Sequence, residues 1–382
     1  MPFNTLYESC TLCPRNCGTD RICGLNSSAG AAVKNAGLNS TGVADVSARK
    51  LGFCGTDKPA GQESLTRKLG FCGESAEIRA ASACLHFGEE PPITVNGGSG
   101  TIFITGCNLR CAFCQNYQIS QCGMGAVLSA EDFADICLKL QAAGAENINI
   151  VTGSHDIPAI AEALSLAKSR GLTVPVCWNC SAYETVEALE LLKGLVDIWL
   201  PDLKTLNSLI ADAVFKAHDY PAVAKKAIRW MIQNTRAEFV PAPNGKEKMM
   251  SGVIIRHLVL PGRLDDTRLT LDWLKKTADR DDDHAACISL MSQYTPVVPE
   301  EGAFSQSQLA SRNSALDAFS NRLLSKDEFA QIRSLIEEYD FQYLFYQELE
   351  EDTEWLPDFN RTQPFSNKLA KPVWHWKSGF VK

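Results

Sequence analysis

The sequence predicts an α/β protein: an open or partial barrel of six βα units, preceded by a small cysteine-rich module. From Gly100 onward, apolar strand-like runs alternate with helical patterns, which is typical of a parallel sheet. Residues 1–98 lack this periodicity and are rich in Gly, Ser, Asn and Ala. With 382 residues, 45% of them hydrophobic, the chain can bury a large core.

We therefore expect three parts. Residues 1–98 form the loop-rich cysteine module, residues 99–300 the barrel core, and residues 301–382 a C-terminal helix and aromatic tail. The run RKLGFCG occurs twice within residues 49–73, which indicates a local duplication in the first part. The tail is rich in Pro and Trp, and we expect it to cover the open side of the barrel.

Six strands are expected, at 101–106, 146–153, 174–180, 196–204, 252–262 and 286–294. Helical patterns separate them. Ser129 and Asp132 predict a capping box at the start of the first long helix, and Gly144 predicts its end. In barrels of this kind the chemistry collects at the carboxyl ends of the strands, so polar residues and cysteines that follow a strand are candidate functional residues.

Charge and composition exclude several classes of partner. The net charge is -8, the sequence pI is about 5.4 and the Lys and Arg residues are scattered, which disfavours nucleic-acid binding. The N-terminal residues have no signal-peptide pattern, and no run of eighteen apolar residues occurs. We expect a cytoplasmic protein that binds no membrane. Its fifteen cysteines are bunched, which indicates metal binding or catalysis rather than disulfides.

Three cysteines directly follow the first expected strand, in the run TGCNLRCAFCQN: Cys107, Cys111 and Cys114. Four thiolates would close a tetrahedral zinc site or saturate a four-iron cluster, whereas three leave one metal position free. No fourth cysteine or histidine lies at a closing distance in the sequence. The pattern therefore predicts a metal centre with one position open to a ligand.

A second group of cysteines lies near the N-terminus. Cys10, Cys13 and Cys17 are spaced for a structural metal or a further iron–sulfur centre. Spacing leaves the fourth ligand open among Cys23, Cys54 and Cys72, and it leaves zinc and an auxiliary cluster as alternatives. A module with a small hydrophobic core needs another source of stability, such as a bound metal. A zinc-like site could contribute ~10–16 kcal/mol of folding free energy.

The run CNLRCAFC resembles the C-x3-C-x-aromatic-C motif of the radical S-adenosylmethionine (SAM) superfamily. The runs SGTIFITGCNLRCAFCQNYQIS, VDIWLPDLK and IIRHLVLPG, with CTLCPRNCG and HFGEEPP, make the chain similar to uncharacterised homologues of pyruvate formate-lyase activating enzyme. The resemblance implies a partial barrel of the radical SAM type and a 4Fe-4S cluster held by Cys107, Cys111 and Cys114. It further implies that the free iron chelates SAM, and that an electron from a donor such as flavodoxin or ferredoxin yields a 5'-deoxyadenosyl radical that abstracts hydrogen.

The resemblance also assigns residues near the methionine and adenine ends of SAM. The backbone beside Phe113 is the position that meets the adenine edge. The strand end Val151-Thr152-Gly153-Ser154-His155 occupies the place of the family's Gly-Gly-Glu, which holds the methionine amino group, and Thr152, Gly153 and Ser154 are its candidate binding residues. This chain lacks the carboxylate, so Thr152, Ser154 or a backbone carbonyl would have to substitute for it.

Further assignments follow from the later motifs. Asn179 stands where activating enzymes often have Asp, and Asp202 and Lys204 match their Asp-Leu-Lys. In the family the Lys approaches the carboxylate or ribose of SAM, and the Asp can help hold a monovalent cation. Arg256 begins the matching R-x4-PG run, and Tyr294 falls where activating enzymes have a His. Asp202 and Lys204 could equally form a simple ion pair.

Two motifs outside the barrel remain. The resemblance favours Cys72 as the fourth thiolate of the N-terminal site, because GFCG precedes HFGEEPP in the resembling proteins. His86, Glu89 and Glu90 of that second motif could line the site or cap a loop ahead of Pro91.

Three functions are consistent with the sequence. The leading hypothesis is a radical SAM enzyme that abstracts hydrogen, with a glycyl-radical enzyme as one candidate protein substrate. A second keeps this chemistry but gives it a small molecule or a peptide as target. The third is a zinc-bound scaffold without radical chemistry, which the absent Gly-Gly-Glu would fit. Hydrogen abstraction needs neither acid nor base, so we expect His155 and His257 to be structural.

Overall fold

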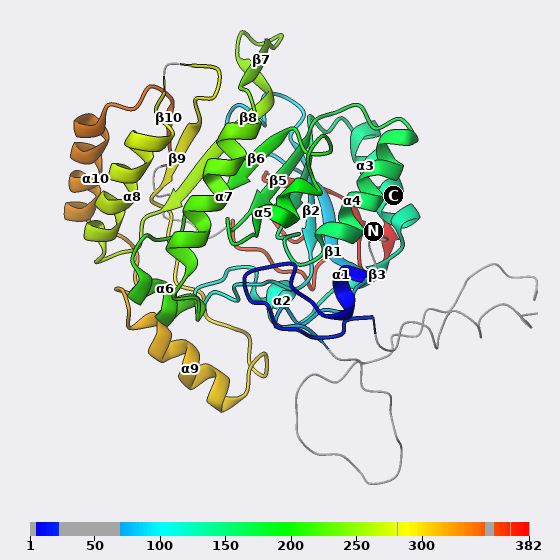
Figure 1. Cartoon of the computed structure of the whole chain (residues 1–382), viewed down its shortest axis with the longest axis horizontal. Coiled ribbons are helices and arrows are strands. Elements are labelled where there is room, and N and C mark those ends of the chain that lie inside the picture. Colours follow the sequence, from blue (N-terminus) through cyan, green and yellow to red (C-terminus); the bar gives the residue numbers. More distant parts are fainter. Residues whose placement is uncertain (1–4, 23–68, 281, 348–354, 367, 382) are drawn as a thin grey trace, which may run out of the picture.

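The computed structural model describes residues 5–22, 69–280, 282–347, 355–366 and 368–381. The fold is mixed α/β, with one 12-stranded sheet whose central part is parallel (Figure 1). Neighbouring parallel strands, in spatial order, are β10 (Leu344–Gln347), β9 (Cys287–Met291), β8 (Glu247–Leu258), β6 (Ile198–Pro201), β5 (Val176–Cys180), β4 (Ile148–Val151) and β2 (Ser99–Ile104). The six expected strands are therefore confirmed, with ends shifted by a few residues. Closure of the sheet into a partial barrel stays a prediction.

Antiparallel strands extend this sheet. They are β1 (Ile78–His86), β3 (Ala126–Leu128), β7 (Glu238–Pro241), β11 (Ala370–His375) and β12 (Gly379–Phe380). β1 lies between β2 and β11, so the part expected to be loop-rich, residues 1–98, also contributes a strand to the main sheet. The sequence of β1, IRAASACLH, is buried along nearly its whole length. A strand covered on both faces lacks the polar–apolar alternation by which strands are recognised, and this explains why β1 was not expected.

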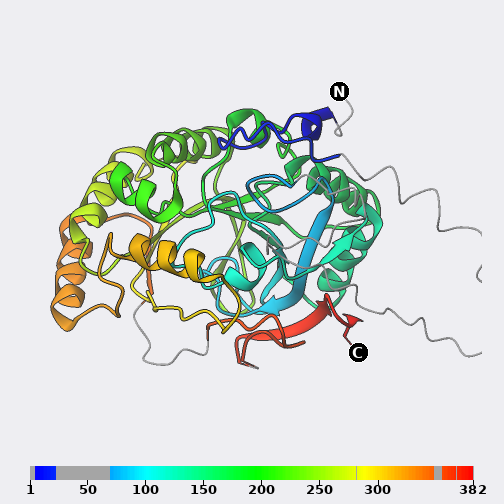
Figure 2. The same ribbon diagram turned by 90° about the horizontal axis from the view of Figure 1, so that it is seen from below.

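The helices are α1 (Thr5–Glu8), α2 (Tyr117–Ser120), α3 (Ala130–Ala142), α4 (Ile157–Ser169), α5 (Val186–Glu190), α6 (Ser208–Phe215), α7 (Tyr220–Asn234), α8 (Leu264–Thr277), α9 (Gln306–Leu316) and α10 (Lys326–Tyr339). The longer helices α3, α4, α7, α8 and α10 lie along the outside of the sheet, whereas α2 and α9 lie beyond the ends of its strands (Figure 1, Figure 2). The predicted capping box of Ser129 and Asp132 opens α3, and Gly144 follows its end with φ +98°. No described helix combines the length and the apolar character needed to span a bilayer.

The parallel strands present different side chains to their two faces. Ile102, Ile150 and Trp178 belong to the large core that the strands share with the helices. Phe103 and Val151, each one residue away, belong to a second cluster on the other face. Since successive strand side chains point to opposite faces, this inner face is where the functional side chains must be sought.

The C-terminal segment covers part of the inner face. Phe359 and Phe365 pack against Phe103, with ring centroids 5.3 and 5.4 Å from that ring. The segment then continues into β11, which pairs with β1. The division of the chain at residues 98 and 300 stays a prediction, although the main sheet includes strands from all three of the expected parts.

Candidate functional site

A sharp turn after β2 brings a cysteine loop, residues 107–114, to the carboxyl end of the sheet. Gly106 has φ +87°, and a Cβ there would lie 2.4 Å from Glu74 Cγ and 2.8 Å from His155 Nε2. Only glycine fits here without a shift of the neighbouring atoms. A side chain would strain the left-handed backbone and would also clash with Glu74 and His155. Arg110 also has a left-handed backbone, with φ +56°. The loop thus folds tightly enough for all three of its cysteines to line one cavity.

This cavity, of about 300 Å³, contains Cys107, Cys111 and Cys114 in its wall. The backbone N–H of Leu109 donates to Cys107 Sγ at 3.3 Å, and Cys114 Sγ lies 3.3 Å from the Ser120 hydroxyl. Burial raises the pKa of the Cys111 thiol, while the nearby Lys204 ammonium lowers it. Every cysteine of the described residues is a free thiol. The loop therefore offers three unpaired sulfurs at one place.

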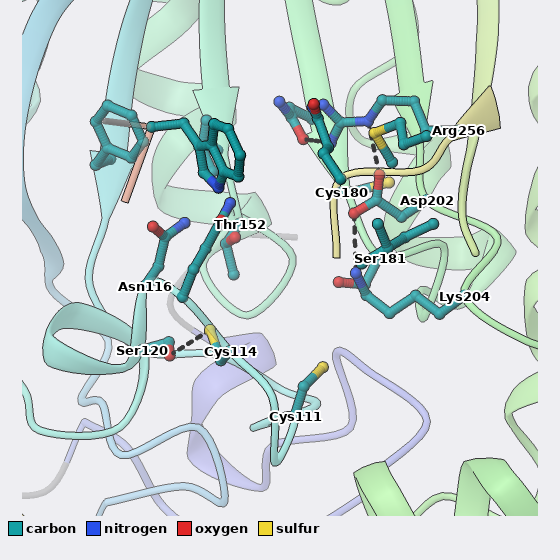
Figure 3. Close-up of a pocket in the computed structure, with 18 of the residues that line it drawn as sticks. Cys111, Cys114, Asn116, Ser120, Thr152, Cys180, Ser181, Asp202, Lys204 and Arg256 are labelled. Carbon is teal, nitrogen blue, oxygen red and sulfur yellow. Dashed lines mark hydrogen bonds and ion pairs between the residues drawn. The ribbon is translucent and has the colours of Figure 1, made fainter. Parts of the chain in front are cut away.

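The charged wall lies across the cavity from Cys111 and Cys114 and consists of Asn179, Asp202, Lys204 and Arg256 (Figure 3). Arg256 Nε donates to Asp202 Oδ1 at 2.6 Å, and its Nη2 donates to Asn179 Oδ1 at 2.5 Å. Lys204 Nζ donates to the other oxygen of Asp202 at 2.9 Å. The side chains come from the ends of three neighbouring parallel strands, or just beyond them.

The electrostatics of the charged wall fix its protonation. Burial alone would raise the pKa of Asp202, but Arg256 and Lys204 outweigh it and lower that pKa below its usual value. The same pairing holds the pKa of Arg256 and of Lys204 above their usual values, although burial opposes it. The wall therefore carries one carboxylate and two cations at neutral pH.

The HFGEEPP motif supplies two more carboxyl groups to the cavity. Arg256 Nη1 lies 3.6 Å from Glu89 Oε2 and 3.9 Å from Glu90 Oε1. Burial raises the pKa of Glu90 to about 7, although Arg256 opposes this. Among the described residues Glu90 Oε2 has no hydrogen-bond partner, and neither has the side-chain amide of buried Asn149 on β4. Of the two interpretations of the motif, the structure places His86, Glu89 and Glu90 in the cavity wall.

The strand end that stands where the family has Gly-Gly-Glu lines the cavity with only some of its residues. Thr152 lines it and has a left-handed backbone with φ +64°. Gly153 is not in the cavity wall, and a Cβ there would lie 2.6 Å from the Trp178 ring. Ser154 is buried outside the wall and donates to Glu184 Oε1 at 2.5 Å. Of these three positions, the structure brings one to the cysteine loop.

The remaining predicted residues are placed as follows. Phe113 lines the cavity and makes an edge contact with Tyr294, with ring centroids 6.0 Å apart. Tyr294 also lines it. His155 Nε2 lies 2.8 Å from Thr105 O, and His257 Nδ1 lies 2.8 Å from Leu203 O. Both histidines are buried outside the cavity wall, as expected for structural residues.

Some residues near the cavity were not found from the sequence. Asn149 is one of them. The feature that could have identified it is that it is a polar residue within the apolar run INIV of β4. Trp355 and Phe365 of the C-terminal segment also line the cavity, in keeping with the expectation that the tail covers the open side of the barrel, although no local pattern identifies Phe365 itself. Glu184 was also missed, and it supports the backbone beside Thr152 through Ser154.

The N-terminal thiols, Cys10, Cys13, Cys17 and Cys72, do not line this cavity. Cys23 and Cys54, the other candidate ligands, lie outside the described residues. Within the described ranges, no three His, Cys, Asp or Glu side chains surround one point closely enough for a single metal ion.

Comparison with known proteins identifies the domain around the cavity. The Radical SAM superfamily matches residues 101–274. The chain is 32% identical over 220 residues to an uncharacterised protein of Methanocaldococcus jannaschii, covering 56% of this chain and 57% of that protein. It is 30% identical over 115 residues to a pyruvate formate-lyase-activating enzyme of Listeria monocytogenes, covering 28% and 46%. The matches thus span about half the length of these relatives.

Two solved structures show partial overlap. A domain of pyruvate-formate lyase-activating enzyme from Bacteroides vulgatus covers 50% of this chain and 89% of that domain, at 12% identity and a TM-score of 0.30. Methylornithine synthase covers 65% of this chain and 70% of its own, at 14% identity and a TM-score of 0.37.

Proposed function

We propose, from the membership of residues 101–274 in the radical SAM superfamily, that this chain binds a 4Fe-4S cluster and SAM in the cavity and abstracts hydrogen from a substrate. One observation carries the proposal: three free thiols and a wall of fixed charges line a single cavity, and Figure 3 shows two of the thiols, Cys111 and Cys114, facing that wall. When bound, the cluster supplies the electron that cleaves the sulfonium of SAM and so generates the hydrogen-abstracting radical.

The cysteine loop fits such a cluster. Three thiolates leave one metal position free, which is what chelation of SAM requires. The N–H of Leu109 donates to Cys107 Sγ, and the charge of Lys204 offsets part of the burial that raises the pKa of the Cys111 thiol. We assign Cys107, Cys111 and Cys114 as the ligands.

The charged wall fits the methionine end of SAM. Lys204 and Arg256 would attract its carboxylate, and Asp202 holds both cations in place through its two oxygens. Asn179 is oriented by Arg256, and its amide also faces the cavity. These roles stay proposals that the geometry supports.

The other end of the site is assigned in the same way. Of Thr152, Gly153 and Ser154, Thr152 is the residue that lines the cavity, so we assign the methionine amino group to its hydroxyl or carbonyl. Gly153 and Ser154 would then support this backbone rather than touch the ligand. Phe113, within the cysteine loop, would lie next to the adenine.

Part of the cavity wall is apolar. Phe103, Ile119, Val151 and Phe365 line the same cavity as the charged wall. Apolar side chains of this kind would help to exclude water once SAM and a substrate are bound.

For the substrate, the similarity to activating enzymes supports a glycine of a partner glycyl-radical enzyme, with flavodoxin or ferredoxin as electron donor. A second candidate is a small polar molecule. It is favoured by the buried carboxyl pair Glu89 and Glu90, one of whose oxygens has no partner among the described residues. A substrate amine or hydroxyl would satisfy that oxygen.

The test is reductant-dependent formation of 5'-deoxyadenosine and methionine by anaerobically purified protein. We expect Cys107→Ala, Cys111→Ala and Cys114→Ala each to abolish it, and Cys122→Ser to leave it unchanged. Activity retained in any of the three would contradict the ligand assignment. A colourless protein that contains zinc and no iron would instead support the scaffold hypothesis. Deuterium transfer into 5'-deoxyadenosine from glycine-labelled partner enzyme, or from a labelled small molecule, would distinguish the two substrates.

A further inference from the structure

The N-terminal thiols form a second cluster of sulfurs that the proposed function does not use. Cys10, Cys13 and Cys72 are buried, whereas Cys17 is exposed. All four are free thiols, although they come from two segments that are far apart in the sequence.

Two of the four sulfurs, those of Cys17 and Cys72, lie beside Gly70. A Cβ at this position would lie 3.1 Å from Cys72 Sγ and 3.7 Å from Cys17 Sγ, so the absence of a side chain leaves the space between them open. The side chains of Cys17 and Cys10 are hydrogen-bonded to each other. Cys13 lies close enough to both of them for electrostatic interaction. The tertiary structure thus adds Cys72 to the three thiols of the CTLCPRNC run.

The backbone around these thiols repeats a pattern seen in the cysteine loop. There, the N–H of the residue two positions on donates to the sulfur of Cys107 and of Cys114. At the N-terminal site, the backbone N–H groups two positions on do the same. Those of Arg15, Thr19 and Glu74 donate to the sulfurs of Cys13, Cys17 and Cys72, respectively. Hydrogen bonds to sulfur stabilise thiolates and tune the metal centres that they hold.

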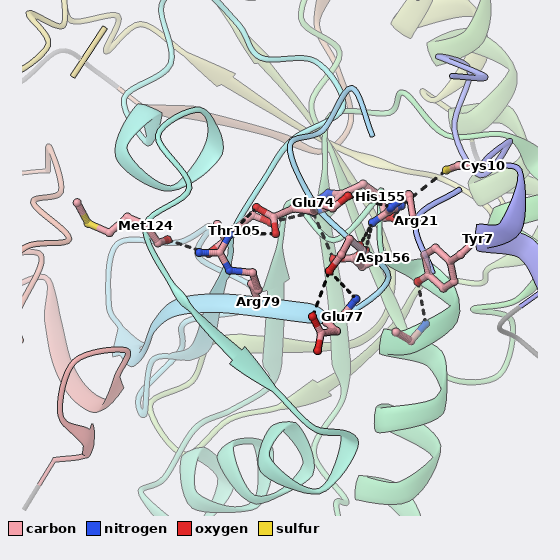
Figure 4. Close-up of polar contacts among 12 residues, drawn as sticks. Tyr7, Cys10, Arg21, Glu74, Glu77, Arg79, Thr105, Met124, His155 and Asp156 are labelled. Carbon is pink, nitrogen blue, oxygen red and sulfur yellow. Dashed lines mark hydrogen bonds and ion pairs between the residues drawn. The ribbon is translucent and has the colours of Figure 1, made fainter. Parts of the chain in front are cut away.

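A buried arginine supports the same site. Arg21 Nη1 lies 3.7 Å from Cys10 Sγ, and Nη2 pairs with Asp156 Oδ1 at 2.6 Å (Figure 4). Arg21 is 1% exposed and also donates to His155 O at 2.6 Å. The cation is therefore held rigidly beside the sulfurs, where it would offset part of the negative charge of a thiolate-bound centre.

Backbone contacts join the two sets of thiols. Cys107 N–H donates to Cys72 O at 3.3 Å. Arg15, between Cys13 and Cys17, donates through Nε to Asn108 O at 2.7 Å, within the cysteine loop. A ligand of one set is thus hydrogen-bonded to a ligand of the other, with no intervening residue.

We propose that Cys10, Cys13, Cys17 and Cys72 hold a second iron–sulfur cluster, which passes the reducing electron to the cluster of the cysteine loop. Four thiolates saturate such a cluster, so it would bind no SAM. Exposed Cys17 offers a protein donor access that buried Cys107 and Cys111 do not. In each transfer the donor loses one electron, the second cluster gains and then releases it, and no bond or proton changes. The relay rests on the proposed function, whereas the existence of the second cluster does not.

Iron and sulfide analysis of anaerobically purified full chain tests the cluster. We expect about eight irons in the wild type, and about four in each of two variants. One variant is the double change Cys13→Ser and Cys72→Ser, and the other changes Cys107, Cys111 and Cys114 to Ser. Cys122→Ser is the control and should keep the wild-type content. A folded triple variant without iron, a wild type with about four irons, or zinc at the N-terminal thiols would each overturn the proposal.

Electron paramagnetic resonance and turnover test the relay. After reduction, the signal of the triple variant should be insensitive to added SAM, whereas the signal of the double variant should respond to it. The double variant should lose SAM cleavage driven by reduced flavodoxin while it retains SAM binding. Unchanged turnover with that donor would overturn the relay. If the double variant fails to fold, the iron content and signal of the triple variant still decide whether the second cluster exists.

Discussion

Arg256 and Asp202 form an ion pair of 2.6 Å at the wall of the cavity, with side chains 14% and 21% exposed. The same guanidinium also lies within 4 Å of Glu89 and Glu90. One largely buried cation therefore lies next to three acidic side chains from two distant parts of the chain, and it shares Asp202 with Lys204, so we expect it to affect both stability and binding.

Arg256→Met should destabilise the protein strongly. Removing one partner of a buried pair leaves uncompensated charge, which costs about 3–5 kcal/mol in the free energy of unfolding. Urea denaturation measures this. The matched control is Arg268→Met, which removes a solvent-exposed pair with Glu338 and should leave the stability nearly unchanged. Equal losses in the two variants would show that Arg256 is not the central cation of the wall.

Glu90→Gln should change how stability depends on pH. The pKa of Glu90 is about 7 in the folded protein, against an ordinary 4.5, mainly because it is buried. Between those values the folded state binds the proton more tightly, so this group's contribution to stability is lost as pH rises toward 7. The glutamine variant lacks that loss. We expect its stability relative to wild type to rise between about pH 4.5 and 7, by on the order of 1–3 kcal/mol.

The difference between variant and wild type is the relevant quantity, because His86 acts oppositely. Burial lowers the pKa of His86 to about 4, so its contribution rises with pH over part of the same range. Glu238→Gln, at an exposed position, is the control and should give a flat difference. A flat difference for Glu90→Gln as well would mean that Glu90 keeps an ordinary pKa.

Gly106→Ala should disrupt the cysteine loop. The left-handed backbone alone costs ~1 kcal/mol with a side chain, and the contacts with Glu74 and His155 add about 1–3 kcal/mol of overpacking. Gly144→Ala is a close control, since Gly144 has φ +98° but no atom near its missing Cβ. We expect a lower melting temperature and lower iron content for Gly106→Ala than for Gly144→Ala. Similar behaviour would show that the turn tolerates a side chain.

Lys204→Ala should weaken SAM binding and leave the iron content unchanged. Lys204 belongs to the charged wall, not to the cysteine loop, and a hydrogen bond to a charged group contributes ~1.5–3 kcal/mol, which is roughly tenfold or more in the dissociation constant. Equilibrium dialysis measures it. Lys193→Ala is the control, because Lys193 lies on the surface and contacts Asn234 at 3.0 Å. An unchanged dissociation constant for Lys204→Ala would make Lys204 a structural partner of Asp202.

The positions of six parallel strands, all but β10, could be predicted because each is a short apolar run between helical patterns. The cysteine loop could be predicted because its spacing is local and it follows β2 directly. β1 and β11 could not be recognised in this way. Their pairing joins segments almost 300 residues apart, and only the packing of the whole sheet makes it favourable.

Local spacing in the sequence determined that three thiols share one loop at the end of a parallel strand. Tertiary structure alone decided that Arg256 lies next to Asp202, Glu89 and Glu90. It also decided that Ser154 donates a hydrogen bond to Glu184 and that the backbone of Cys107 donates to that of Cys72. The physical reason is that a loop's geometry follows from its own few residues. Contacts across a sheet instead depend on burial and on strand order, which distant parts of the chain set together.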